Sequence, residues 1–168
     1  KAFRPTVHDK ITIPADAFPL AGPHGAPSGL AVSKFPGIVL DDKQAKIEGK
    51  WGKGQGLKPY FGFGYRYSSD PKGSATFTFN APKSGKFDAR ISYQPHENRG
   101  KSVPVEVKAG DQMRQATINM TKKAPLKNGF YSLGILDLKK DQKVTIRLSA
   151  KGAQGNVHVD AAQLLPVD

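Results

Sequence analysis

The chain has no cysteine among its 168 residues. This absence excludes disulfides, thiolate catalysis, zinc fingers and iron–sulfur sites, and it leaves the redox compartment open. Long apolar runs are also missing, since none approaches the roughly 18 residues that a membrane-spanning helix needs. The first residue is Lys1 rather than Met, which is typical of a processed chain or an excised piece. We therefore expect a folded chain that is held together by its hydrophobic core alone.

Motifs for catalysis and for phosphate binding are missing as well. No G-x-S-x-G nucleophile elbow and no H-E-x-x-H metal motif occurs, and the glycine-rich stretch at 49–56 lacks the spacing of a dinucleotide loop. The histidines are scattered, and His158 falls on the outward phase of a predicted strand. Asp41-Asp42 supplies oxygens that suit calcium, but a turn at a strand end is the favoured use. We expect no enzyme, no catalytic residue, no cofactor and no metal.

Positive charge is in excess, with 26 Lys and Arg against 14 Asp and Glu, a net charge of +12. Nucleic acid, anionic lipid, acidic polysaccharide or an acidic protein would be attracted. Two stretches without acidic residues, between Glu48 and Asp70 and between Asp111 and Asp137, carry much of this charge in predicted loops. The plain alternative is a solvated basic surface that has no partner.

Helical periodicity is scarce, and the chain from Ile38 onward alternates apolar and polar residues with a period of two, as half-buried strands do. Clear runs lie at 74–80 and 85–93. The inward residues of the later runs are Val103/Val105/Val107, Ala116/Ile118/Met120, Val144/Ile146/Leu148 and Val157/Val159/Ala161. About eight or nine such strands, separated by turn signals, predict an all-β fold, an antiparallel β-sandwich.

Prolines gather at the N-terminus instead. Six of the 13 prolines fall in residues 1–37, and the segment 21–29 has no apolar period. This composition predicts an extended Pro-rich linker or strap over 1–37, with one short edge strand at 10–14, followed by a folded domain over 38–168.

Aromatic residues concentrate between Trp51 and Tyr67, interleaved with glycines and cations. Exposed flat rings offer stacking faces for sugars or nucleobases, and an arginine grips carboxylate or sulfate groups. A polar loop at 94–100 adds further donors. The predicted ligand-binding residues are Trp51, Tyr60, Phe61, Tyr65, Arg66, Tyr67, His96, Asn98 and Arg99. The alternative is that these rings close one end of the sandwich.

The order of these features resembles the golvesin-type domain, also called the xanthan-lyase carbohydrate-binding-like domain. The resemblance covers about 130 residues and leaves out 1–37. The matching segments are Ile38-Val-Leu-Asp-Asp42, Gly49-Lys-Trp51, Tyr60-Phe-Gly62 with Tyr65-Arg-Tyr67, Ala75-Thr-Phe-Thr-Phe79, Pro82 with Gly85-Lys-Phe87, Asn98-Arg99 with Val103-Pro-Val105, Leu133-Gly134, Val144-Thr-Ile146, and Val157-His-Val-Asp-Ala-Ala-Gln-Leu164. The loop 119–128 departs from the family's usual short polar turn, because it is rich in lysine.

The resemblance implies a galactose-binding-like jelly roll that is appended to secreted bacterial polysaccharide-active enzymes and some oxidoreductases. It implies a non-catalytic carbohydrate-binding module, secreted, periplasmic or at the cell surface, beside a catalytic domain of the same polypeptide. The +12 charge favours an acidic glycan that bears uronate or sulfate groups. The alternative is a structural accessory domain of a larger enzyme with no ligand of its own, and nucleic acid is a less favoured partner.

Overall fold

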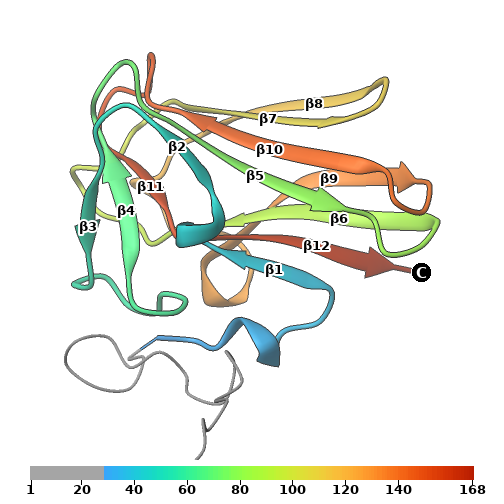
Figure 1. Ribbon diagram of the computed structural model, residues 1–168. Helices are drawn as coiled ribbons and strands as arrows, with labels where there is room; N and C mark the ends of the chain where they lie inside the picture. The colour runs from blue at the N-terminus through green and yellow to red at the C-terminus, as the bar shows by residue number, and fades with distance from the viewer. Residues whose placement is uncertain (1–28) are drawn as a thin grey trace, which may run out of the picture.

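Two antiparallel sheets pack face to face in the computed structural model, which describes residues 29–168 (Figure 1). The four-stranded sheet has the order β1-β12-β6-β9. Its strands are β1 (Ile38–Asp41), β12 (Ala161–Val167), β6 (Gly85–Ser92) and β9 (Phe130–Leu138). The predicted all-β sandwich is confirmed.

The opposite sheet has five strands in the order β2-β5-β10-β7-β8. They are β2 (Lys46–Glu48), β5 (Ser74–Asn80), β10 (Lys143–Ser149), β7 (Val103–Ala109) and β8 (Gln112–Ile118). A small third sheet, in the order β11-β4-β3, contains β11 (Val157–Val159), β4 (Tyr65–Ser68) and β3 (Gly52–Gly54). Single 3-10 turns are η1 (Val32–Lys34), η2 (Asp42–Gln44) and η3 (Lys127–Gly129).

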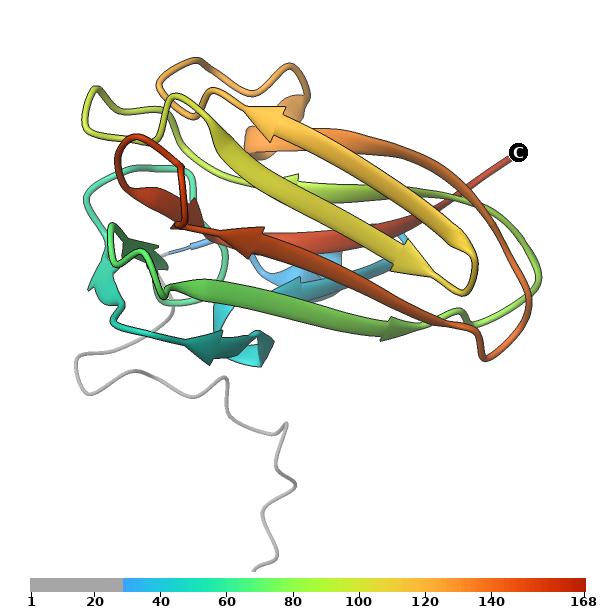
Figure 2. The ribbon, with the colours of Figure 1, turned by 90° about the horizontal axis from the view of Figure 1, so that it is seen from above.

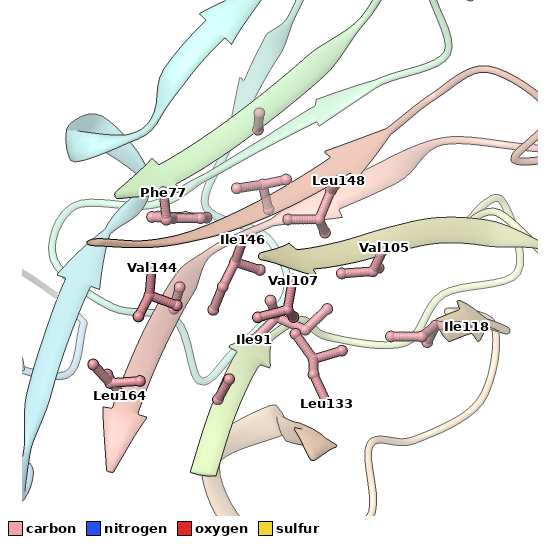
Figure 3. Packing of buried hydrophobic residues seen from close by; sticks show 14 of the residues in the cluster. Phe77, Ile91, Val105, Val107, Ile118, Leu133, Val144, Ile146, Leu148 and Leu164 are labelled. Carbon is pink, nitrogen blue, oxygen red and sulfur yellow. The ribbon is translucent and has the colours of Figure 1, made fainter. Parts of the chain in front are cut away.

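The core between the two large sheets follows from the period-two alternation of the sequence. In β5 and β10, Phe77 pairs with Ile146, and both side chains are fully buried. Figure 3 shows them in one cluster with Val107 from the adjacent strand β7 and with Ile91 and Leu133 from the opposite sheet. The inward residues that the alternation predicts in β5, β6, β7 and β10 are therefore buried, and they hold the domain together.

Residues 29–37 pack onto the sandwich instead of leading away from it. The amide of Gly29 donates to the carbonyl of Gly62 (3.1 Å), and Leu30 forms a parallel bridge with Phe61. Val32 and Phe35 cover a second apolar cluster, which is separate from the main core. The part of the predicted strap that falls within the described residues is thus docked, and the edge strand predicted at 10–14 lies outside them.

The small sheet β11-β4-β3 lies at one end of the sandwich (Figure 1). The connections β4–β5, β6–β7, β8–β9 and β10–β11 meet at this end, whereas the turns β5–β6, β7–β8 and β9–β10 lie at the other (Figure 2). The small sheet carries much of the aromatic segment 51–67, and the connection β6–β7 contains the polar loop at 94–100, so this end of the molecule brings the candidate residues together. We call it the loop end.

Candidate functional site

Strands β3 and β4 form a ribbon in which glycines face tyrosines. Gly52 pairs with Tyr67 and Gly54 with Tyr65. A Cβ atom on Gly52 would lie 2.6 Å from Cζ of Tyr67, and one on Gly54 would lie 2.7 Å from Cε2 of Tyr65. Each ring therefore lies directly across a glycine, where no other residue fits. Alternation along β4 directs Arg66 to the opposite face of the ribbon.

The first hollow at the loop end, which we call the tyrosine hollow, has a volume of about 440 Å³. It is lined by Lys50, Trp51, Gly52, Tyr67, Ser68, Ser69, Asp70 and Asn156. The rings of Trp51 and Tyr67 are both half-buried, so part of each remains open to solvent. Asp70 accepts hydrogen bonds from the amides of Lys50 (2.8 Å) and Lys72 (3.0 Å), which lower the pKa of this carboxyl. The hollow thus combines aromatic surface with an ionised acceptor.

Arg99 lies beneath Tyr67 with only 4% of its surface exposed. Its guanidinium carbon is 5.5 Å from the centroid of the Tyr67 ring, and its Nη1 donates to Oδ1 of Asn98 (3.1 Å). Arg99 forms no ion pair with any described carboxylate, and burial lowers its pKa. A buried cation of this kind keeps its charge, because arginine does not deprotonate in proteins, and it places positive potential under the tyrosine hollow.

His158 is fully buried, which corrects the prediction that it faces outward. All three residues of β11 are buried, because its main chain pairs with β4 and its two faces are both covered. The imidazole lies 4.2 Å from the Tyr65 ring, and Nδ1 accepts a hydrogen bond from Nε of Arg99 (3.3 Å). Burial, together with the charge of Arg99, holds the pKa of His158 well below its usual value. The ring is therefore neutral and supports Arg99.

The second hollow, which we call the arginine hollow, has a volume of about 420 Å³ and lies on the Arg66 side of the ribbon. Its lining residues are Asp41, Asp42, Lys43, Lys53, Gly54, Gln55, Phe63, Gly64, Tyr65 and Arg66. Nε of Arg66 donates to Oδ2 of Asp42 at 2.9 Å. Nζ of Lys43 lies 5.8 Å from the centroid of the Phe63 ring. This hollow gathers cations around two acids.

Asp41 and Asp42, which line the arginine hollow, lie close to the buried carboxyl group of Asp160. Burial raises the pKa of Asp41 to about 6, and the neighbouring charge of Asp42 adds to the shift. Burial also raises the pKa of Asp160, whose oxygens accept hydrogen bonds from the Phe61 amide (2.9 Å) and the Ser92 hydroxyl (3.3 Å). Within residues 29–168, no group of three or more His, Asp or Glu side chains is arranged to hold a metal ion.

Three of the rings predicted to face a ligand lie in the interior. Tyr60, Phe61 and Tyr65 are 2%, 0% and 5% exposed. Phe61 packs against Phe35 and Phe130, with ring centroids 4.9 and 5.4 Å away, and Tyr65 is covered by His158 and Arg99. The expectation that these three rings offer stacking faces is wrong, because the docked strap and the polar interior cover them. Burial likewise removes Arg99 from direct contact with a ligand.

The remaining candidates separate into two groups. Trp51 and Tyr67 line the tyrosine hollow. Asn98 lies next to this hollow, because its main-chain carbonyl accepts hydrogen bonds from the amide (3.0 Å) and Nδ2 (3.2 Å) of the lining residue Asn156. Arg66 lines the other hollow. His96 lies behind Asn98 and accepts its amide hydrogen bond at Nδ1 (3.3 Å). The sequence does not single out Asn156, since residues 151–156 show only the composition of a turn.

Comparison with known proteins identifies the family. The Golvesin C-terminal domain model matches residues 38–166. The chain belongs to this family. The match confirms the resemblance and begins where β1 begins, so the docked residues 29–37 lie outside it. No curated protein sequence matches the chain.

Solved structures share the fold. A Paenibacillus xanthan lyase matches with a TM-score of 0.69 and 22% identity over 77% of this chain, which spans only 13% of the lyase. A family 35 carbohydrate-binding module from Clostridium thermocellum matches with a TM-score of 0.56 and 16% identity, covering 77% of this chain and 98% of the module. The family 35 carbohydrate-binding module of Cellvibrio japonicus Abf62 matches with a TM-score of 0.54 and 15% identity, covering 78% of this chain and 94% of the module.

No described helix is long and apolar enough to cross a membrane.

Proposed function

We propose that this domain is a non-catalytic carbohydrate-binding module and that the tyrosine hollow binds the sugar. The half-buried rings of Trp51 and Tyr67 beside Asn156 and Asp70 carry this proposal. Family membership and the fold shared with family 35 carbohydrate-binding modules support it. In this proposal the domain belongs to a secreted bacterial polysaccharide-active protein, where it holds the polymer near a catalytic domain at the cell surface or in the periplasm.

The hollow supplies the two kinds of contact that sugars use. The apolar face of a pyranose ring packs on Trp51 or Tyr67, as sugars do on exposed aromatic surfaces. Hydroxyl groups donate to the Asp70 carboxylate, whose backbone hydrogen bonds keep it ionised and fixed in place. Because the contact area is small and stays wet, we expect dissociation constants of about 1 μM to 1 mM.

Exposed lysines favour an acidic glycan. Nine of them lie on the segments that meet at the loop end: Lys50, Lys53, Lys58, Lys72, Lys101, Lys122, Lys123, Lys127 and Lys151. The acidic residues on the surface beside them are Glu48, Glu97 and the half-buried Asp70, so the lysines outnumber the acids. Arg99 adds a positive charge beneath the hollow. Uronate or sulfate groups on the polymer would gain an attraction that salt screens within about 10 Å at 0.1 M ionic strength.

Affinity gel electrophoresis with acidic and neutral polysaccharides tests the proposal. We expect polygalacturonate or alginate to retard the protein at 50 mM NaCl, dextran to leave it unretarded, and 500 mM NaCl to reduce the retardation. Tyr67→Ala should lose most of the binding, because its ring forms one side of the hollow, whereas Tyr67→Phe should keep it. The exposed Lys86→Gln at the opposite end serves as the charge control. Equal retardation of the wild type and Tyr67→Ala, with both folded, would contradict the assigned site.

The alternative, a spacer domain without a ligand, is favoured by one observation. The rings of Tyr60, Phe61 and Tyr65 are buried in the interior, and strap residues from 29–37 pack against Phe61. Retardation by none of the polysaccharides, together with a loss of stability when the strap contacts are removed, would support the spacer role.

A further inference from the structure

We infer that the arginine hollow is a second binding site, which takes the carboxylate or sulfate group of a sugar residue. It shares no lining residue with the tyrosine hollow. Alternation along β4 places Arg66 on the opposite face of the ribbon from Tyr67, so one ribbon separates the two hollows. The inference depends on the proposed function in one respect, namely that the carboxylate or sulfate group belongs to a sugar.

Arg66 provides an oriented fork for the oxyanion. Its Nε donates to Oδ2 of Asp42 (2.9 Å), and this contact fixes the plane of the guanidinium. Neither Nη atom donates to a described residue, although the side chain is only 22% exposed. Two parallel N–H donors held in this way match the two oxygens of a carboxylate or sulfate group. The protein thus orients the fork, and no residue within 29–168 accepts a hydrogen bond from its Nη atoms.

Two lysines give the hollow a net positive charge. Lys53 is the cross-strand partner of Arg66, and its charge lowers the pKa of Asp42, so it lies within electrostatic reach of the same pair. Lys43 lies 3.9 Å from Asp41 through Nζ and Oδ2. Three cations therefore face two carboxyl groups, and burial raises the pKa of both carboxyls. The excess of positive charge selects an anion.

The rest of the lining favours a sugar over a bare ion. Phe63 is half-buried and lines the hollow with part of its ring. Nε2 of Gln55 donates to the carbonyl of Phe63 (2.6 Å), which leaves Oε1 to accept from a hydroxyl. An aromatic surface and an amide oxygen next to an oxyanion fork correspond to the apolar face, the hydroxyl groups and the acidic group of a uronic acid or a sulfated sugar.

NMR titration of the ¹⁵N-labelled full chain tests this site separately from the tyrosine hollow. The amides of Gly54 and Gly64 report on the arginine hollow, while the Gly52 amide and the Trp51 indole report on the other. The probes are galacturonic acid, galactose 6-sulfate and galactose. We expect the Gly54 and Gly64 signals to shift with either acid and to remain unchanged with galactose. A shift with only one acid identifies the carboxylate or the sulfate group as the ligand.

Variants assign the shift to the named side chains. Arg66→Lys keeps a cation beside Asp42 but loses the fork, and Lys53→Gln removes one exposed charge. Each should weaken acid binding at Gly54 about fivefold, because Arg66→Lys loses the bidentate hydrogen bonding and Lys53→Gln loses one charge near the surface, whereas Lys86→Gln should not. No shift at Gly54 and Gly64 with either acid, an equal shift with galactose, or unchanged affinity in both variants would overturn the inference. Shifts at these glycines without any at Trp51 would instead refute the assignment of the tyrosine hollow.

Discussion

Replacing Phe61 by alanine separates a core role from a ligand role. The Phe61 side chain is fully buried, and its ring contacts Phe35 and Phe130 at centroid distances of 4.9 and 5.4 Å. Removing a buried phenylalanine ring costs about 3–5 kcal/mol through lost burial and the cavity left behind. For a domain of this length that cost corresponds to a fall in Tm of about 10 °C. Differential scanning calorimetry measures the fall.

Phe63→Ala is the matched control for Phe61→Ala. Phe63 is half-buried, lines the arginine hollow and contacts no other aromatic ring within residues 29–168, so its loss should lower Tm by only a few degrees. At temperatures where Phe61→Ala is folded, its retardation by polygalacturonate should equal that of the wild type. A Tm within 3 °C of the wild type combined with lost glycan binding would show that Phe61 touches the ligand, and it would refute the reasoning from burial.

Three further predictions follow from single contacts. The folded chain binds the Asp41 proton more tightly than the unfolded chain does, because burial raises the pKa of Asp41 from 3.8 to about 6. The free energy of unfolding should therefore fall by up to about 3 kcal/mol as the pH rises through this range. Calorimetry at several pH values should show a smaller fall for Asp41→Asn. Gly52→Ala should displace the Tyr67 ring and weaken retardation by acidic glycans, whereas Gly56→Ala should not, since its Cβ has space. Gln112→Ala should speed hydrogen exchange of the Asp137 amide, which donates to its side chain (3.1 Å).

The sandwich was predictable because most of its strands are long and covered on one face only. In β5, Phe77 and Phe79 are buried while Thr78 is exposed, so the period of two is readable from the sequence. Strand β11 could not be interpreted in this way. It has three residues, and both of its faces are covered, so the polar residue His158 lies inside and breaks the expected alternation.

The candidate site was only partly predictable, because burial within the segment 51–67 depends on distant parts of the chain. Phe61 is buried by the strap and by Phe130, and no local pattern distinguishes it from Phe63. The glycine–tyrosine pairing that exposes part of Tyr67 depends on the register of β3 against β4. Asn156 reaches the hollow only through the turn before β11. The composition therefore indicates that the segment 51–67 contains the site, whereas the tertiary fold determines which of its rings face solvent.

Fluorescence titration of Trp51 tests the central claim most directly, because Trp51 is the only tryptophan of the chain and lines the tyrosine hollow. Adding galacturonate oligomers should give a saturable change in its emission with a dissociation constant of about 1 mM or lower, weakened by salt and by Tyr67→Ala. An unchanged spectrum with polygalacturonate, alginate and dextran, under conditions where the protein is folded, would contradict the claim that this hollow binds carbohydrate.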